Sequence, residues 1–386
     1  MSMTIAAAAT RAGAFAAATI LCLLPSAAHA SGTITNLGTL RGGESSGGYI
    51  NNAGSVVAGT SDTPANHPHA FRWSAGVMTD LGTLGGSFSF ANGMSTDASA
   101  VVGTSALAGG DFHAFLWTPL GGMVDLGTLG GALSTARGTS PGGGVVVGSS
   151  DLVGGEERAF RWTASGGMVD LGTLGGQEST ANAININLTH IVGSSEVVGG
   201  DEHAFRWSLA QGMIDLGTLG GPDSSAAALS STGSVVVGTS AIPGGDRRAF
   251  RWTSSGGIQN LGTIGNSDSF ALAVSANGVT VGGYVNDRSD GSRAMLWTQA
   301  IGMVDLNVYL PAIGIDLTHW RLKRVNGVSS DGLTVSGEGT FDDEARAFLV
   351  TFSPCGTVDF DGDGDDGTDN DLEAFFRRIA GGACAP

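Results

Sequence analysis

The sequence predicts an all-β protein: a seven-bladed β-propeller built from four-stranded repeats of about 45 residues. Two phrases, Leu-Gly-Thr-Leu and Ala-Phe-Arg-Trp, recur with close variants at steps of 44 or 45 residues. Self-similarity at this period is typical of a repeat architecture whose units become stable by packing on their neighbours. Copies of the first phrase, the last of them degenerate, begin at Leu37, Leu81, Leu126, Leu171, Leu216, Leu261 and Leu306.

One unit, residues 168–208, contains four short runs that alternate apolar and polar side chains, as half-buried strands do. The runs are 168–174, 179–186, 190–195 and 203–208. Gly-rich turns separate them, the first at Gly175-Gly176, and they leave no room for a helix. A unit of this size fits one propeller blade. We expect the repeated phenylalanines and tryptophans to pack between blades.

The two ends of the repeat region predict that the blades close into a ring. The last unit, about 321–352, lacks a Leu-Gly-Thr-Leu strand after it, whereas the first such strand, 33–40, has no blade before it. Pairing the two, with Leu37 beside Phe348, removes both exposed sheet edges. An open β-solenoid is the alternative, but it would require capping segments, and the sequence shows none.

The first thirty residues predict a secretory signal peptide cleaved after Ala30. Arg11 supplies a basic region, 13–24 is uncharged, and Ala28-His29-Ala30 is a small-x-small cleavage site. A retained membrane anchor is the alternative, which the short apolar run disfavours. No later apolar run is long enough to cross a bilayer, so we expect a secreted protein without membrane insertion.

Composition excludes some partners. The formal net charge is -17, which disfavours nucleic acid and anionic lipid because both require basic patches. The 65 glycines are periodic and alternate with apolar residues, as in a folded, turn-rich chain rather than a disordered one. We therefore expect a monomeric folded ring.

The fourth run of each unit carries a resemblance to a known family. The chain resembles the bacterial extracellular HAF repeats, which are named for a His-Ala-Phe triplet, over about residues 33–352. The resemblance implies an exported protein and brings no established activity, cofactor or catalytic residue. The literal triplets are His69-Ala70-Phe71, His113-Ala114-Phe115 and His203-Ala204-Phe205.

Repeated charged residues are expected to have structural roles, because an active site requires one unusual place rather than several equal ones. Arg161 is expected opposite Asp170, and Arg206 opposite Asp215, as cross-strand pairs. The histidines of the triplets are expected to be turn or surface residues rather than metal ligands.

The least repetitive place is a longer insertion, 307–320, which could be a ligand loop or could simply plug the closure of the ring. Its candidate ligand residues are Tyr309, Asp316, His319 and Trp320.

The sequence predicts three parts: the signal peptide (1–30), the propeller (31–353) and a small acidic, disulfide-closed calcium module (354–386). The mature chain has two cysteines, Cys355 and Cys384, so a disulfide between them is expected in an exported protein. Carboxylates alternate after Cys355, and Gly364 stands sixth, as in the first half of an EF-hand-type calcium loop. The expected Ca²⁺ ligands come from Asp359, Asp361, Asp363, Asp365, Asp369 and Asp371.

An amphipathic segment, 372–379, follows this loop and is expected to be a short helix. Loop and helix together resemble one half of a dockerin module, which implies docking onto a cohesin-like partner. The tail departs from that pattern in two ways: it has one loop instead of two, and Asn370 occupies the twelfth loop position where an acid is usual.

These observations predict a secreted, non-enzymatic scaffold for extracellular interaction or adhesion, docked or anchored through its C-terminal module to a protein or glycan partner. A carbohydrate-active hydrolase or lyase on the propeller is the alternative from another class, and it would require carboxylates that converge at one non-repeating spot. A self-associating surface-layer component is a third interpretation.

If the calcium module and the ring are independent, chelation should affect only the module. Without the ion its carboxylates repel one another, so we expect EDTA to remove a small thermal transition and to leave the main one unchanged. Differential scanning calorimetry with and without EDTA measures this. A large loss of ring stability would contradict the two-module organisation.

Overall fold

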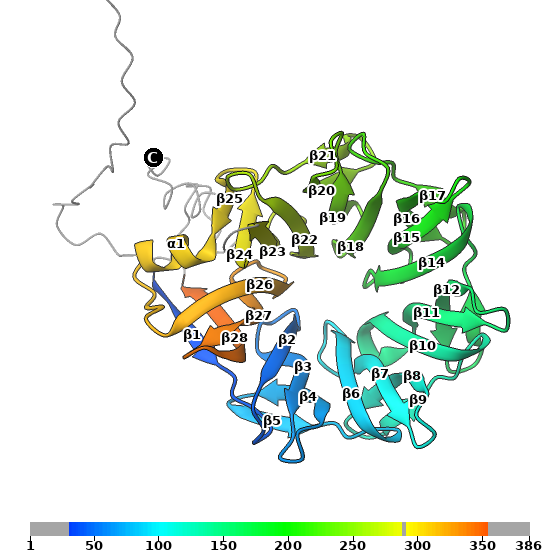
Figure 1. Cartoon of the computed structure of the whole chain (residues 1–386), viewed down its shortest axis with the longest axis horizontal. Coiled ribbons are helices and arrows are strands. Elements are labelled where there is room, and N and C mark those ends of the chain that lie inside the picture. The colour runs from blue at the N-terminus through cyan, green and yellow to red at the C-terminus, as the bar shows by residue number, and fades with distance from the viewer. Residues whose placement is uncertain (1–30, 288–290, 354–386) are drawn as a thin grey trace, which may run out of the picture.

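The computed structural model describes residues 31–287 and 291–353, which form seven four-stranded antiparallel sheets around a central axis (Figure 1). The predicted fold class is confirmed: the described chain is an all-β, seven-bladed propeller. The expected signal peptide, residues 1–30, and the expected calcium module, residues 354–386, lie outside the described residues.

In six blades the four strands follow the chain from the innermost strand outward, and in the seventh β26, β27 and β28 do so while β1 is outermost (Figure 1). The inner strands are β2 (Ser45–Ile50), β6 (Gly85–Met94), β10 (Gly130–Thr139), β14 (Gly175–Ile184), β18 (Ser224–Leu229), β22 (Asp268–Val274) and β26 (Trp320–Val328). The second strands are β3 (Val56–Asp62), β7 (Val101–Leu107), β11 (Val146–Leu152), β15 (Ile191–Val197), β19 (Val235–Ala241), β23 (Val281–Asp287) and β27 (Thr334–Phe341).

The two outer positions complete each blade. The third strands are β4 (Pro68–Ser74), β8 (Phe112–Thr118), β12 (Glu157–Thr163), β16 (Glu202–Ser208), β20 (Arg247–Thr253), β24 (Gly291–Thr298) and β28 (Glu344–Ser353). The outermost strands are β5 (Val77–Asp80), β9 (Gly122–Asp125), β13 (Gly167–Asp170), β17 (Gly212–Asp215), β21 (Gly257–Asn260), β25 (Gly302–Asp305) and β1 (Ser31–Asn36). A 3-10 turn, η1 (Pro141–Gly143), and one helix, α1 (Leu306–Ala312), complete the described elements.

A phenylalanine of the third strand is fully buried with a glycine opposite it in six of the seven blades, and Met295 takes its place in the sixth. In the third blade Phe160 pairs across the strands with Gly148, and Phe160 is fully buried. A Cβ atom on Gly148 would overlap the carbonyl oxygen of Thr135 on the inner strand. The glycine therefore allows the strands to approach closely beside the phenyl ring of Phe160, which explains why the Val-Val-Val-Gly phrase recurs.

The buried clusters lie between blades, as predicted for the aromatic residues. One of them joins Ala58 and Ala70 of the first blade to Val101 and Phe115 of the second, with Trp117 packed against it. Burial of apolar surface contributes about 25 cal/mol per Å², so each blade is stabilised mainly by its neighbours.

The Leu-Gly-Thr-Leu phrase is not a strand, which corrects the expected run 168–174. The strand β13 ends at Asp170, Gly172 takes a left-handed φ of 79°, and the phrase crosses to the next blade. The predicted Gly175-Gly176 turn is also wrong, because Gly175 opens the ten-residue strand β14. The apolar-polar alternation continues through the phrase because Leu171 and Leu174 both pack against the core. The side-chain pattern therefore did not reveal that the strand ends at Asp170.

Serine hydroxyls hold this connection in place. Ser134 of the third blade accepts from the amide of Ala114 in the second blade at 2.8 Å and donates to the carbonyl of Gly127 at 2.6 Å. Ser150 accepts from the amide of Leu129 at 2.9 Å. Two buried hydroxyls thus satisfy backbone groups that leave the strand ladder.

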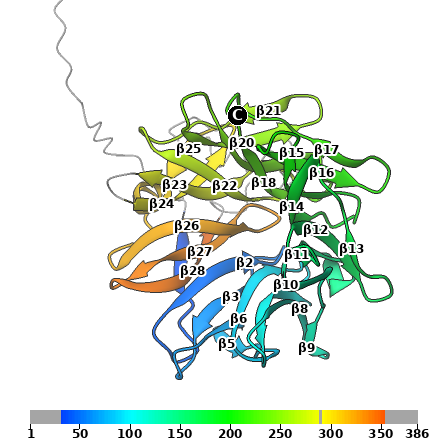
Figure 2. The ribbon, with the colours of Figure 1, turned by 45° about the vertical axis from the view of Figure 1, so that its right-hand side comes forward.

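The ring closes as the sequence predicts. The strand β1 pairs antiparallel with β28, with Asn36 opposite Phe348, and the amide of Leu37 donates to the carbonyl of Ala347 at 3.1 Å. The first and last described strands therefore lie side by side in one blade (Figures 1 and 2). Because the ring is closed, each blade has a neighbour on both sides, whereas the two terminal units of a solenoid would each have an uncovered face.

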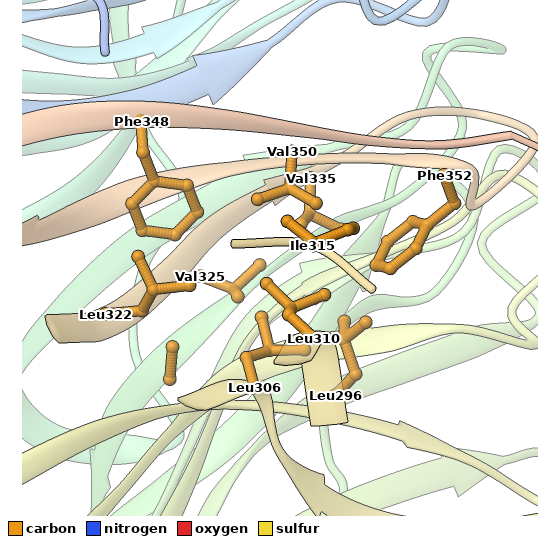
Figure 3. Close-up of a cluster of buried hydrophobic side chains, with 11 residues drawn as sticks. Leu296, Leu306, Leu310, Ile315, Leu322, Val325, Val335, Phe348, Val350 and Phe352 are labelled. Atoms are coloured by element: carbon orange, nitrogen blue, oxygen red, sulfur yellow. The ribbon is translucent and has the colours of Figure 1, made fainter. Parts of the chain in front are cut away.

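The insertion after β25 contains a helix that the sequence did not predict. Asp305 caps α1 by accepting from the amide of Asn307. Leu310 of α1 and Ile315 after it are buried with Phe348 and Phe352 in the core between the sixth and seventh blades (Figure 3). The missed signal is the cap followed by apolar residues four apart, at Leu306 and Leu310. This packing agrees with the alternative that the insertion plugs the closure.

The two ends of the ring have different turns. The end called here the connection face carries the Leu-Gly-Thr-Leu connections and the turns between second and third strands, because Gly130 and Leu152 pair at that end of the third blade. The opposite face carries the turns between first and second strands and those between third and outermost strands. The β1–β28 pair ends at the opposite face, where the amide of Phe352 donates to the carbonyl of Leu333.

The first and seventh blades meet at glycine backbones. Gly48 has a φ of 134°, and its carbonyl accepts a hydrogen bond from the hydroxyl of Ser336. A Cβ atom on Gly48 would lie 2.6 Å from the amide nitrogen of Gly337 and 2.8 Å from its Cα atom. Any side chain at Gly48 would therefore push the first blade away from the seventh.

We expect Gly48→Ala to destabilise the ring more than Gly199→Ala. Both glycines have a positive φ, but a Cβ on Gly199 meets nothing within 4 Å. The shared backbone cost is about 1 kcal/mol, and the overlap at Gly48 adds about 1 to 3 kcal/mol. Urea unfolding gives both free energies of unfolding. Equal losses would show that the glycine contact does not hold the closing blades together.

Candidate functional site

The repeated acid at the end of each outermost strand accepts a hydrogen bond from the backbone two residues on. In the second blade the Oδ1 atom of Asp125 accepts from the amide of Gly127 at 2.8 Å. Asn36 and Asn260 make the same contact at 2.9 and 2.8 Å, so the role does not require a charge. The residues that do this are Asn36, Asp80, Asp125, Asp170, Asp215, Asn260 and Asp305.

Some of the same acids pair with the residue that precedes the Ala-Phe phrase on the third strand. The Nδ1 atom of His69 lies 2.9 Å from Asp80, and the matching distance is 2.9 Å for His113 and Asp125. His203 lies 2.8 Å from Asp215. Most of these acids are about two-fifths exposed, so each pair contributes less than about 1 kcal/mol.

The predicted partners of these acids were wrong. The register places Asp170 opposite Phe160 and Arg161 opposite Val169, and the Nε atom of Arg158 lies 3.9 Å from Asp170. Arg206 likewise lies opposite Ile214 rather than Asp215. The true partner, Arg158, stands two positions before Phe160, the residue directly opposite the acid. This diagonal contact can be predicted only when the outermost strand is known to end at the acid.

The candidate ligand residues of the insertion do not converge. Trp320 packs edge-on against Phe341 and Phe348, with ring centroids 5.1 and 6.1 Å away. His319 lies 2.7 Å from Asp342 at the surface. Asp316 is exposed and accepts two hydrogen bonds from Thr318, which lower the pKa of its carboxyl group.

Tyr309 lies on α1 against the closing core, and its hydroxyl is buried without a hydrogen-bond partner in the described part of the chain. Burial raises the pKa of the Tyr309 phenol. A hollow of about 510 Å³ beside the helix is lined by Asp316 and Trp320 but not by Tyr309 or His319. A ligand role for the four residues stays a prediction.

The central channel is the site that the sequence did not reveal. A cavity of about 460 Å³ is lined by residues of all seven inner strands. Arg137 is the one charged residue in that lining, and Asn92, Asn182 and Asn326 lie around it. These residues are spread over the second, third, fourth and seventh blades, so their meeting depends on ring closure and on which side of each strand faces the axis.

The connection face carries a second repeated feature. On four successive blades, the turn between second and third strands reads apolar-Gly-Gly-acid, and the apolar residue is exposed. Val153 is 86% exposed and Val198 is 83% exposed. The four turns begin at Ala108, Val153, Val198 and Pro243.

The predicted disulfide of Cys355 and Cys384, and the predicted Ca²⁺ ligands Asp359, Asp361, Asp363, Asp365, Asp369 and Asp371, lie outside the described residues. Within residues 31–287 and 291–353, no group of three or more His, Cys, Asp or Glu side chains is arranged to hold a metal ion. None of the helices described there is long and apolar enough to span a membrane.

No family model matches the sequence, and no curated protein matches it. Among solved structures the chain is similar to TolB from Acinetobacter baumannii, at 13% identity and a TM-score of 0.46 over 77% of this chain. The chain spans 64% of the length of that TolB structure.

Two further solved structures are similar to this chain. The putative TolB from Agrobacterium tumefaciens matches at 14% identity and a TM-score of 0.45, over 72% of this chain and 94% of the other. A chain of a mitotic checkpoint complex matches at 14% identity and a TM-score of 0.48, over 88% of this chain and 98% of the other. Such similarity concerns the fold alone.

We expect Asp125→Asn to be tolerated and Asp125→Ala to destabilise. Asparagine keeps the acceptor for Gly127 and loses only the exposed contact with His113, whereas alanine leaves the amide of Gly127 without its partner. The expected losses are below about 0.5 kcal/mol and about 1 kcal/mol respectively. Urea unfolding measures both, and a larger loss for the asparagine variant would give the charge the main role.

Proposed function

We propose that this chain is a secreted, non-enzymatic scaffold that presents its connection face to an extracellular protein or glycan and is docked through its C-terminal module. The observation that carries the proposal is the repeated apolar-Gly-Gly-acid turn, with exposed apolar residues on four neighbouring blades. Exposed apolar side chains that gather on one face, rimmed by charges, are characteristic of interaction surfaces.

The glycines of these turns allow a backbone conformation in which the apolar residue before them points into solvent. Gly199 and Gly200 have φ values of 117° and 94°, and a Cβ on either would meet nothing within 4 Å. The acid that follows, Asp201 in the fourth blade, places a carboxylate beside each apolar contact. A partner with apolar side chains next to basic ones matches this alternation.

The chain leaves the ring on the side away from these turns. The strand β28 ends at Ser353 on the opposite face, and the 33 residues that follow contain the proposed calcium module. A module that extends from there would leave the connection face open. This geometry supports docking through the tail while the ring is engaged, including docking to a cohesin-like partner.

Membership of the HAF repeats, secretion and Ca²⁺ binding are parts of the same proposal. Their support is the recurring phrases, the leader-like first thirty residues and the alternating carboxylates after Cys355. A role without catalysis is supported by the residues that end the outermost strands, because they make the same turn contact in every blade whether they are acids or asparagines. An enzyme would require a convergent pair that breaks this repetition.

The proposal predicts that acidic substitutions on the connection face weaken partner binding. We expect the full chain to bind a component of an extracellular protein and glycan array, and we expect the double variant Val153→Asp, Val198→Asp to bind it at least tenfold more weakly. Leu120→Asp is the matched control, because Leu120 is at least as exposed as the two valines but lies in a turn of the opposite face.

Two results would overturn the proposal. The first is unchanged binding by the double variant together with loss in the Leu120 variant, which would move the interaction surface to the opposite face. The second is turnover of an arrayed polysaccharide by the intact chain, which would favour the hydrolase or lyase. Circular dichroism of each variant checks that the ring is folded.

A further inference from the structure

The charge of the central channel differs from the charge of the chain. The formal net charge is -17, yet the cavity within the seven inner strands is lined by no Asp or Glu among the described residues. Arg137 of β10 contributes the one charge of that lining. An acidic protein thus carries, on its axis, a cavity with a net positive charge.

Arg137 is free to bind a ligand. Its side chain is exposed to the channel, and within the described residues it forms no hydrogen bond or ion pair. The arginines that pair with acids do so away from the channel, as Arg293 does with Asp305 at 2.9 Å. A guanidinium group presents a planar fork of donors that matches a carboxylate, and it stays charged at every physiological pH.

The carboxamides around Arg137 are held in position by the next blade. The Nδ2 atom of Asn182 donates to the carbonyl of Ala226 at 2.8 Å, and Asn92 and Asn326 donate in the same way to Ala136 and Gly47, each at 3.3 Å. None of the three Oδ1 atoms accepts a hydrogen bond from a described residue. Each therefore offers an acceptor to a hydroxyl group.

The inner strand of the seventh blade begins with basic residues that do not line the cavity, which Asn326, Gly327 and Val328 line at the other end of the strand. Arg321, Lys323 and Arg324 lie at the connection-face end of β26, and Lys323 is the one lysine of the chain. Glu338 pairs with Arg324 at 3.5 Å, and the guanidinium group of Arg324 lies 4.5 Å from the centre of the Tyr284 ring in the sixth blade. Arg137 therefore remains the one charged residue of the cavity lining.

We propose that the channel binds a small hydroxylated carboxylate of the sugar-acid class. Its carboxylate would pair with Arg137, and its hydroxyl groups would donate to the Oδ1 atoms of the surrounding asparagines. One fixed positive charge balances one carboxylate, and a cavity of about 460 Å³ is in the size range of small-molecule sites. The apolar residues Ile50 and Ile184, which also line it, suit the carbon face of a sugar ring.

The test is calorimetric titration of the full chain with galacturonate. We expect saturable binding, at least tenfold weaker binding of neutral galactose, and at least a tenfold loss with Arg137→Gln. Arg161→Gln is the matched control, because Arg161 lies on the same blade but does not line the channel. Asn182→Ala should weaken galacturonate more than acetate, which has no hydroxyl group.

The site is independent of the connection-face turns, so the variant Val153→Asp, Val198→Asp should bind galacturonate as the natural chain does. Loss of partner binding with retained galacturonate binding therefore separates the two proposals. Equal affinities for galacturonate and galactose, an unaffected Arg137 variant, or no heat at millimolar galacturonate would each overturn the channel site. Sulfate binding as tightly as galacturonate would overturn the carboxylate assignment.

Discussion

Burial of one large side chain between adjacent sheets is the interaction on which the rest of this molecule depends. A phenylalanine, or Met295 in the sixth blade, is fully buried against the preceding blade, and the glycine opposite it allows the strands to approach. No blade of this size could bury that surface alone. The need for a neighbour on both sides drives the chain to close, and β1 supplies the last strand.

Closure also creates the places where function can lie. The connection face repeats an exposed apolar residue on four blades, and the axis brings together side chains that are far apart in sequence, such as Asn92 and Asn326. The insertion is the exception to the repeat, and its buried leucines show that it serves packing between the sixth and seventh blades. The non-repeating insertion thus packs between the sixth and seventh blades, whereas the repeated strands and turns form the surfaces proposed for binding.

The predictions that failed share one cause. Apolar alternation identified strands correctly but did not mark their ends, so Leu-Gly-Thr-Leu was assigned to a strand when it is the connection between blades. Asp170, the acid before this phrase, was consequently paired with Arg161 instead of Arg158, the residue that precedes the Ala-Phe phrase. Glycines with positive φ, such as Gly172, end the strand, and a side-chain pattern does not report backbone conformation.

The sequence by itself determined the period, the number of blades, the burial of the phenylalanines and the pairing of the first strand with the last. Each of these follows from local repetition and from the cost of exposed edges and unburied apolar surface. Only the tertiary structure decided what faces the axis, what faces solvent and what partners each acid. Those depend on register and on the angle between blades, which bring residues about 45 or more positions apart into contact.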